Sequence, residues 1–150
     1  MENKINIYNY QELSLASNLI KKYEGLSLAP YINIYGEYAI GYGTTGKHLN
    51  NANITIDEAN ILLRNDVLNT SKKLLELLNH HNYNLNNNQF NAFVSFFNSN
   101  YFEESMKHRF IIGEDINKII ECIPLYTIIH NKHSNQLKER RAEEYKLAKR

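Results

Sequence analysis

The stretch of sequence that decides the fold begins with Glu24-Gly25-Leu26-Ser27-Leu28 and continues to Gly36-Glu37-Tyr38-Ala39-Ile40-Gly41-Tyr42-Gly43-Thr44-Thr45-Gly46. Its tyrosines and isoleucines favour strands, and its glycines favour turns. We therefore expect a small β-hairpin region from Leu28 to Lys47. The residues before it, from Gln11 to Tyr23, carry apolar side chains at helical spacing and predict a helix that Gly25 ends.

The sequence after the hairpin region predicts helices. Thr55-Ile56-Asp57-Glu58 has the form of a capping box and opens a long helix that we expect to reach Leu78. A cluster of three asparagines from Asn86 begins another helix. Its apolar residues recur at helical spacing and predict a core-facing stripe of Phe90, Phe93, Val94 and Phe97. Shorter helices are expected over 103–110, 115–123 and 134–148, so the predicted fold is α+β and mostly helical.

The length of 150 residues is that of one ordinary domain. We expect a β-containing lobe over residues 24–55, a linking helix over 56–78, and a helical lobe over 79–150 that also includes the first helix, 11–23. A long helix that joins two such lobes leaves a cleft between them, and clefts of this kind are common ligand sites.

The overall charge gives no reason to expect a nucleic-acid partner, because the formal net charge is only +1. The C-terminal stretch is locally basic, but its acidic residues alternate with Lys138, Arg140 and Arg141. This pattern predicts a solvated helix face; attraction to an anionic polymer such as a cell wall is the alternative. The single cysteine, Cys122, lies in an apolar run, which predicts a buried thiol.

Targeting and cofactor signals are not visible. No stretch has the form of a secretory signal or is long and apolar enough to span a bilayer, so we expect synthesis in the cytoplasm and no membrane insertion. The six histidines show no metal-ligand spacing with cysteines or acids, so neither a metal nor another cofactor is expected.

Glu24 is the first candidate for chemistry. It lies in the last turn of the first predicted helix, where the helix dipole disfavours a negative charge. A protonated carboxyl at such a position suits a general acid. An exposed glutamate that the site merely tolerates is the alternative, and position alone does not decide between them.

The wider pattern resembles the phage-type lysozymes, which are also called endolysins or muramidases. The resemblance begins with Glu24-Gly25-Leu26-x-Leu28, Tyr31 and Gly41-Tyr42-Gly43. It continues through Ile54-Thr55, Asp57-Glu58-Ala59, the segment from Asn88 to Phe96, and Arg140-Arg141-x-x-Glu144. It implies a lysozyme-like fold, peptidoglycan as the substrate, an inverting glycoside hydrolysis without a cofactor, and Glu24 as the general acid.

Two departures from the family pattern concern the water that attacks the glycosidic bond. The family usually has an aspartate nine residues after its glutamate and a threonine six residues further on, and these positions hold Asn33 and Ala39. An amide carries no charge and is a very weak base, although its oxygen can orient a water. Many members have a histidine after the Gly-Tyr-Gly motif, whereas this chain has Thr44.

Glu37 is the candidate replacement for the missing carboxylate. If residues 37–43 form an extended strand, Glu37 shares a face with Ala39. An exposed turn residue next to Gly36 is the alternative. A separation of about 5–10 Å between the two carboxyl groups is the range that glycoside hydrolysis requires. Tyr31, Tyr42 and Thr44 are candidates for binding the sugar, although half-buried strand packing explains the tyrosines equally well.

Three functions agree with these residues. The chain binds peptidoglycan with weak or lost hydrolysis, as Asn33 and Ala39 favour. Alternatively it is an active muramidase that uses Glu24 with Glu37 or with a water held by Asn33. The third is a non-catalytic role, as a structural component of a phage or as the binding partner of another protein. For the first two we expect the periplasmic cell wall to be the site of action, reached after release from the cell.

Overall fold

The computed structural model describes residues 4–46, 52–99, 103–129 and 131–150. The elements follow the order η1 (Tyr10–Leu13), α1 (Ser14–Glu24), β1 (Ser27–Ile32), β2 (Tyr38–Gly41), β3 (Thr44–Thr45), α2 (Ile56–His80), α3 (Asn87–Asn98), α4 (Glu103–Ile111), α5 (Ile116–Cys122), η2 (Ile123–Leu125), β4 (Ile128–Ile129), β5 (Lys132–His133) and α6 (Asn135–Ala148). The fold is α+β and mostly helical, as the sequence predicted.

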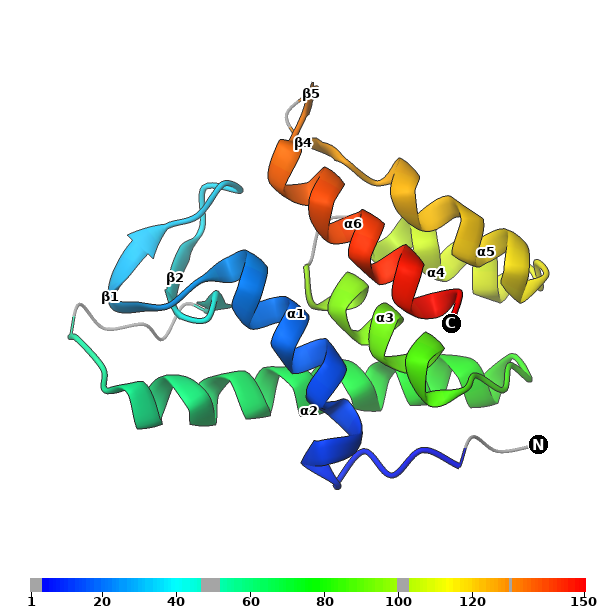
Figure 1. Cartoon of the computed structure of the whole chain (residues 1–150), viewed down its shortest axis with the longest axis horizontal. Coiled ribbons are helices and arrows are strands. Elements are labelled where there is room, and N and C mark those ends of the chain that lie inside the picture. Colours follow the sequence, from blue (N-terminus) through cyan, green and yellow to red (C-terminus); the bar gives the residue numbers. More distant parts are fainter. Residues whose placement is uncertain (1–3, 47–51, 100–102, 130) are drawn as a thin grey trace.

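The arrangement of these elements is built along α2 (Figure 1). Strands β1, β2 and β3 form an antiparallel sheet over the first half of this helix, and α3 lies over its second half. Helix α6 packs on α3, and α1 lies between the sheet and these helices. The division into two lobes remains a prediction. The predicted end of the hairpin region at Lys47 lies outside the described residues.

The start of α2 has the capping box that the sequence predicted. The Thr55 hydroxyl accepts a hydrogen bond from the Glu58 N–H, and the Glu58 carboxylate accepts one from the Thr55 N–H. This exchange satisfies two N–H groups that a helix start leaves without partners. The helix continues to His80, two residues beyond the predicted end. Helix α3 begins with a second capping box, made by Asn86 and Gln89.

The core is centred on α3. Every residue from 90 to 97 is buried, not only the predicted apolar stripe. Helices α1, α2 and α6 all pack against α3, so no side of this stretch is left to face water. A helix surrounded in this way buries its polar residues too, and Asn91 and Ser95 therefore need internal partners.

The prediction of a solvated basic face over α6 is wrong. Arg140, Arg141 and Glu144 are 2%, 0% and 0% exposed, whereas Lys138 is exposed as expected. The alternation of charges arises because one face of α6 packs on α3 and carries its charges into the protein. The prediction for Cys122 also needs correction, since this residue is only half-buried.

The hairpin formed by β4 and β5 was not predicted. Each strand has two residues, and the register pairs Ile128 with His133 and Ile129 with Lys132. Runs this short carry no readable alternation of apolar and polar residues. Among the described residues, no helix is both long enough and apolar enough to cross a membrane.

Candidate functional site

A cleft of about 290 Å³ lies between the β1–β2 hairpin, the middle of α2 and the start of α6. Four of the predicted site residues line it together, namely Glu24, Tyr31, Asn33 and Glu37. The other three, Ala39, Tyr42 and Thr44, are not part of its lining. The sequence therefore identified residues from two separate elements that the fold brings to one cleft.

Glu24 is the last residue of α1. Gly25 follows with φ +69°, a left-handed conformation that ends the helix and that glycine adopts at little cost. The Glu24 carboxylate also lies directly against Gly43, where a Cβ atom would be only 2.6 Å from Oε2. Glycine at position 43 thus makes room for the carboxylate.

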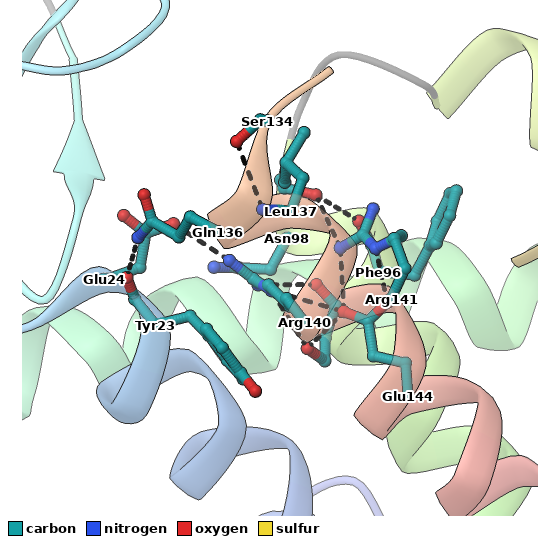
Figure 2. A network of polar contacts seen from close by, with 12 residues as sticks. Tyr23, Glu24, Phe96, Asn98, Ser134, Gln136, Leu137, Arg140, Arg141 and Glu144 are labelled. Atoms are coloured by element: carbon teal, nitrogen blue, oxygen red, sulfur yellow. Dashed lines mark hydrogen bonds and ion pairs between the residues drawn. The ribbon is translucent and has the colours of Figure 1, made fainter. Parts of the chain in front are cut away.

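Arg140 is the partner of Glu24 on the helical side of the cleft (Figure 2). Its Nη1 donates a hydrogen bond of 3.0 Å to Glu24 Oε1, and the side chains of Arg140 and Glu24 are 3% and 26% exposed. Arg140 Nη2 donates to the Ser95 carbonyl at 2.8 Å, and Nε contacts Glu144 Oε1 at 3.2 Å. The guanidinium is therefore fixed by α3 and α6 and holds the Glu24 carboxylate from the helical side.

Arg141 and Glu144 complete this buried network (Figure 2). Arg141 Nε lies 2.7 Å from Glu144 Oε2, and Nη2 donates to Oε1 at 2.8 Å. The guanidinium also lies over the Phe96 ring, 4.4 Å from its centroid. Burial lowers the pKa of Arg141, and the charge of Glu144 opposes this effect. The Ser95 hydroxyl donates to Glu144 Oε1 at 2.7 Å, which accounts for the burial of this serine.

Charge balance links Glu24 to this network. The two guanidinium groups of Arg140 and Arg141 face one buried carboxylate, that of Glu144, so one positive charge remains without compensation. The Glu24 carboxylate, which accepts from Arg140 Nη1, supplies the missing negative charge. Since an unpaired buried charge is strongly unfavourable, Glu24 stabilises the fold independently of any catalytic role.

Asn33 occupies the turn between β1 and β2. Its Oδ1 accepts hydrogen bonds from the N–H groups of Tyr35 and Glu37, both at 2.9 Å, and its own N–H donates to the Glu37 carbonyl. An amide oxygen has two lone pairs, so these two bonds occupy its capacity to accept. Only the NH₂ group of the side chain remains for a ligand. The side chain orders the turn, and its oxygen is no longer available to accept a proton from a water.

Ala39 lies in the middle strand, in register with Tyr31 on one side and Thr45 on the other. Directly paired residues share one face of a sheet. Tyr31 and Thr45 line the cleft, whereas Ala39 is fully buried between them. Thr45, which sequence analysis did not identify, brings a hydroxyl-bearing side chain to this face beside Ala39. Burial raises the pKa of Tyr31, and the charge of Glu24 adds to this effect.

The side chains of Thr44 and Tyr42 make contacts within the fold and do not line the cleft. The Thr44 hydroxyl donates a hydrogen bond of 2.6 Å to Asp66 on α2, which ties β3 to the helix. Asp66 lines the cleft, and its pKa is raised by burial although the Thr44 hydrogen bond acts in the opposite direction. Tyr42 packs against the core with the Lys21 ammonium 5.3 Å above its ring centroid. Neither side chain is placed to contact a sugar in the cleft.

Glu37 lies just before β2, with its side chain exposed at the cleft. Residues 37–43 do not form one continuous strand, because β2 spans Tyr38–Gly41 and φ at Gly41 is +66°. The break at Gly41 comes after Ala39, so it leaves the alternation from Glu37 to Ala39 intact. Glu37 lines the cleft together with Tyr31 and Thr45, the two residues that pair with Ala39. Glu37 reaches the cleft because the turn ordered by Asn33 directs it there.

Asp66, Lys73 and Arg140 are the cleft residues with charged side chains that sequence analysis did not assign to the site. Arg140 belongs to the Arg-Arg-x-x-Glu element, which was noted only as part of a resemblance. Asp66 lies on α2, where an acidic residue also fits an ordinary solvated helix face. Among the described residues, no group of three or more His, Cys, Asp and Glu side chains is arranged to hold a metal ion.

Comparisons with known proteins agree with this geometry. The model of the phage lysozyme family matches residues 21–144. The solved structures that resemble the chain include the muramidase domain of SpmX from Asticaccaulis excentricus, with 28% identity, a TM-score of 0.68, and coverage of 88% of this chain and 92% of that one. Comparison with the sequences of curated proteins gives no match.

Two phage enzymes show the same fold at lower identity. The endolysin from Escherichia coli O157:H7 phage FAHEc1 is 21% identical with a TM-score of 0.71, and the alignment covers 99% of this chain and 96% of the endolysin. The active form of the P1 phage endolysin Lyz is 20% identical with a TM-score of 0.67, and the alignment covers 89% and 82%. Both therefore support the lysozyme-like fold.

Proposed function

Because this chain belongs to the phage lysozyme family, we propose that it binds the glycan strands of bacterial peptidoglycan in the cleft and hydrolyses them at a strongly reduced rate. Glu24 is the candidate proton donor in this proposal. Asn33 and Ala39 mark the positions where help for the attacking water has been lost. The chain would meet its substrate at the periplasmic cell wall.

The occupied amide oxygen of Asn33 is the observation that carries the proposal. In an inverting hydrolysis, an acid protonates the glycosidic oxygen while a base takes a proton from the water that attacks the anomeric carbon. Asn33 Oδ1 already accepts two backbone N–H groups, so the asparagine lacks both the charge and a free acceptor. Loss of general-base assistance typically lowers a rate by about 10²–10⁴. An aspartate would instead keep one oxygen on the turn and free the other for a water.

The surroundings of Glu24 give it a structural role beside its candidate role as the acid. Its Oε1 accepts a hydrogen bond of 3.0 Å from the nearly buried guanidinium of Arg140. Retention of Glu24 is also explained by its charge balance with Arg140 and Arg141. Its presence alone is therefore no argument for full activity.

A second candidate function is that of an active muramidase in which Glu37 takes the place of the missing carboxylate. The observation in its favour is that Glu37 and Glu24 line one cleft. Glu37 is exposed, so its carboxylate is free to approach a bound sugar. A third candidate, a non-catalytic phage structural or partner-binding role, fits the same fold.

The test uses purified, insoluble peptidoglycan and two readouts, sedimentation of bound protein and release of new reducing ends. We expect the natural chain to sediment with the polymer and to release reducing ends about 10²–10⁴ times more slowly than an active family member. Fast release that Glu37→Gln abolishes would establish the muramidase with a replaced carboxylate. Absence of both binding and release would leave the structural or partner-binding role.

A further inference from the structure

The two walls of the cleft offer unequal chemistry to a bound glycan. On the helical side, the Glu24 carboxylate lines the cleft and accepts a hydrogen bond of 3.0 Å from Arg140 Nη1. On the hairpin side, the amide oxygen of Asn33 already accepts two backbone N–H groups, and the side chain of Ala39 is fully buried. The cleft therefore supplies an acid from one wall, while neither of these hairpin residues activates a water from the other.

Two further carboxylates line the cleft, but their surroundings do not suit a base for an attacking water. Asp66 Oδ2 accepts a hydrogen bond of 2.6 Å from the Thr44 hydroxyl, which anchors this carboxylate to β3. The side chain of Glu37 is exposed, and no residue that the structure describes holds its carboxylate in place. A general base has to lie within hydrogen-bond reach of the water it activates. A cleavage that needs no such water is therefore favoured.

The Glu24 carboxylate has one oxygen left for a substrate. Oε1 accepts from Arg140, and Oε2 lies against Gly43, where a Cβ atom would come within 2.6 Å of it. In the part of the chain that the structure describes, Oε2 has no hydrogen-bond partner. An oxygen that is held in place and still free can give a proton to the glycosidic oxygen and later accept a proton on the same face of the sugar.

The substrate itself carries groups that can do the two tasks that the hairpin wall has lost. The acetamido group at C2 of an amino sugar can stabilise the positive charge at C1, which is otherwise the task of a second carboxylate. The free hydroxyl at C6 can attack C1 in place of a water. Intramolecular groups in good orientation reach effective molarities of about 10⁵–10⁸ M, whereas loss of general-base assistance costs about 10²–10⁴ in rate. The intramolecular advantage is the larger of the two.

We propose that the chain cleaves glycan strands chiefly by intramolecular transglycosylation, in which the C6 hydroxyl of the cleaved sugar replaces water and Glu24 is both acid and base. This inference goes beyond the proposed hydrolysis. It rests on the proposed function only in that a strand has to occupy the cleft with its glycosidic bond at Glu24.

The bonds and protons of this reaction balance without water. Glu24 Oε2 gives its proton to the glycosidic oxygen as the bond from that oxygen to C1 breaks, and the acetamido oxygen forms a bond to C1 from the opposite face. The C6 oxygen then displaces the acetamido oxygen from C1, and the C6 hydroxyl gives its proton to Glu24. One strand becomes two, of which one has a new C4 hydroxyl and the other ends in an anhydro sugar.

The products distinguish this reaction from hydrolysis. Purified peptidoglycan is digested in water labelled with heavy oxygen, and the new strand ends are identified by mass spectrometry. We expect unlabelled anhydro ends to exceed labelled reducing ends about tenfold or more. Glu24→Gln should abolish both products while circular dichroism shows a folded chain. Glu139→Gln, on the exposed side of α6, is the matched control and should give the products of the natural chain.

A variant with restored water handling gives the complementary result. Asn33→Asp with Ala39→Thr should make labelled reducing ends the main product. Strands with acetylated C6 hydroxyls lack the nucleophile, so acetylation should reduce cleavage by the natural chain far more than cleavage by this double variant. Removal of the acetyl groups with mild base should restore cleavage by the natural chain.

The possible outcomes separate this inference from the proposed function. Labelled reducing ends as the main product of the natural chain would overturn the inference and leave the proposed function standing. Strands that are bound but stay intact would overturn the inference as well. A chain that neither binds nor cleaves the strands would refute the proposed function itself.

Discussion

The two walls of the cleft differ in how strongly the fold constrains them. On the helical wall, Glu24 belongs to a network of buried charges that links α1, α3 and α6 through Arg140 and Glu144. On the hairpin wall, the side chain of Asn33 bonds to the backbone of its own turn and to no other residue that the structure describes, and Ala39 is a small residue in a three-stranded sheet. The wall that retains the family residue is the one where its loss would leave a buried charge unpaired.

This difference explains how a catalytic motif can be half preserved. Replacement of the family's aspartate and threonine by Asn33 and Ala39 leaves the rest of the fold as it was, because the amide oxygen of Asn33 still orders the turn and an alanine fits the strand. A change at Glu24 disturbs Arg140, whose other partners are buried. Stability therefore retains the acid whether or not the chain hydrolyses its substrate.

The largest effect is expected from Glu144→Gln, which removes the carboxylate that both buried arginines face. Breaking a buried ion pair from one side destabilises a protein by about 3–5 kcal/mol. Denaturation by urea, followed by circular dichroism, measures this loss. The double variant Arg141→Met with Glu144→Met removes charge from both sides and should lose much less. A cost below about 1 kcal/mol for Glu144→Gln would show that the buried network does not constrain the helical wall.

A smaller effect is expected from Asn33→Ala, which removes the acceptor of the Tyr35 and Glu37 N–H groups. Each hydrogen bond of this kind contributes about 1 kcal/mol, so the free energy of unfolding should fall by about 1–2 kcal/mol. Asn33→Asp retains an oxygen that can accept both hydrogen bonds. It serves as the matched control, and its stability should be close to that of the natural chain. Equal losses in the two variants would contradict the role given to the amide oxygen.

Glu24→Gln should lower the free energy of unfolding by about 1 kcal/mol. A hydrogen bond to a charged group is worth about 1.5–3 kcal/mol, and relief of the helix dipole returns about 0.3–1 kcal/mol. The glutamine can still accept from Arg140, and the site is partly exposed, so the net loss is modest. Glu139→Gln, on the exposed side of α6, should change stability by less than about 0.5 kcal/mol. A more stable Glu24→Gln variant would contradict the structural role of Glu24.

The smallest effect concerns pH and Asp66. Burial raises the pKa of this carboxyl in the folded protein, so the folded state binds its proton more readily than the unfolded state. The ionised group therefore lowers stability at neutral pH, and this penalty disappears as the pH falls below the pKa of the unfolded chain. We expect Asp66→Asn to melt at a higher temperature than the natural chain at pH 7, with the difference shrinking toward pH 3. A variant that is less stable at pH 7 would show that the Thr44 hydrogen bond outweighs burial.

The sequence predicted most of the fold because its helix starts carry local signals. The capping residues Thr55 and Asn86 act on N–H groups within the next turn, so their effect is readable from a few neighbours. The burial of Arg140 and Arg141 was not readable in this way. It depends on α6 packing against α3, which is distant in the sequence.

The candidate site was predictable to a similar extent. Glu24, Tyr31, Asn33 and Glu37 lie within one short segment, and the fold keeps them at one cleft. The partners that determine their chemistry come from elsewhere, since Arg140 and Asp66 lie on α6 and α2. The saturation of Asn33 Oδ1 depends on the conformation of the turn, which the residue types alone do not specify.

The central claim is that hydrolysis was lost on the hairpin wall while the helical wall remained competent. The most direct test is the rate at which Asn33→Asp with Ala39→Thr releases reducing ends from peptidoglycan, relative to the natural chain. Asn33→Asp alone covers the case in which a threonine does not fit the buried position 39. We predict a gain of about 10²–10⁴, which Glu24→Gln in the same background should abolish. A natural chain that already matches the double variant, or a folded double variant that binds the polymer and stays inert, would contradict the account.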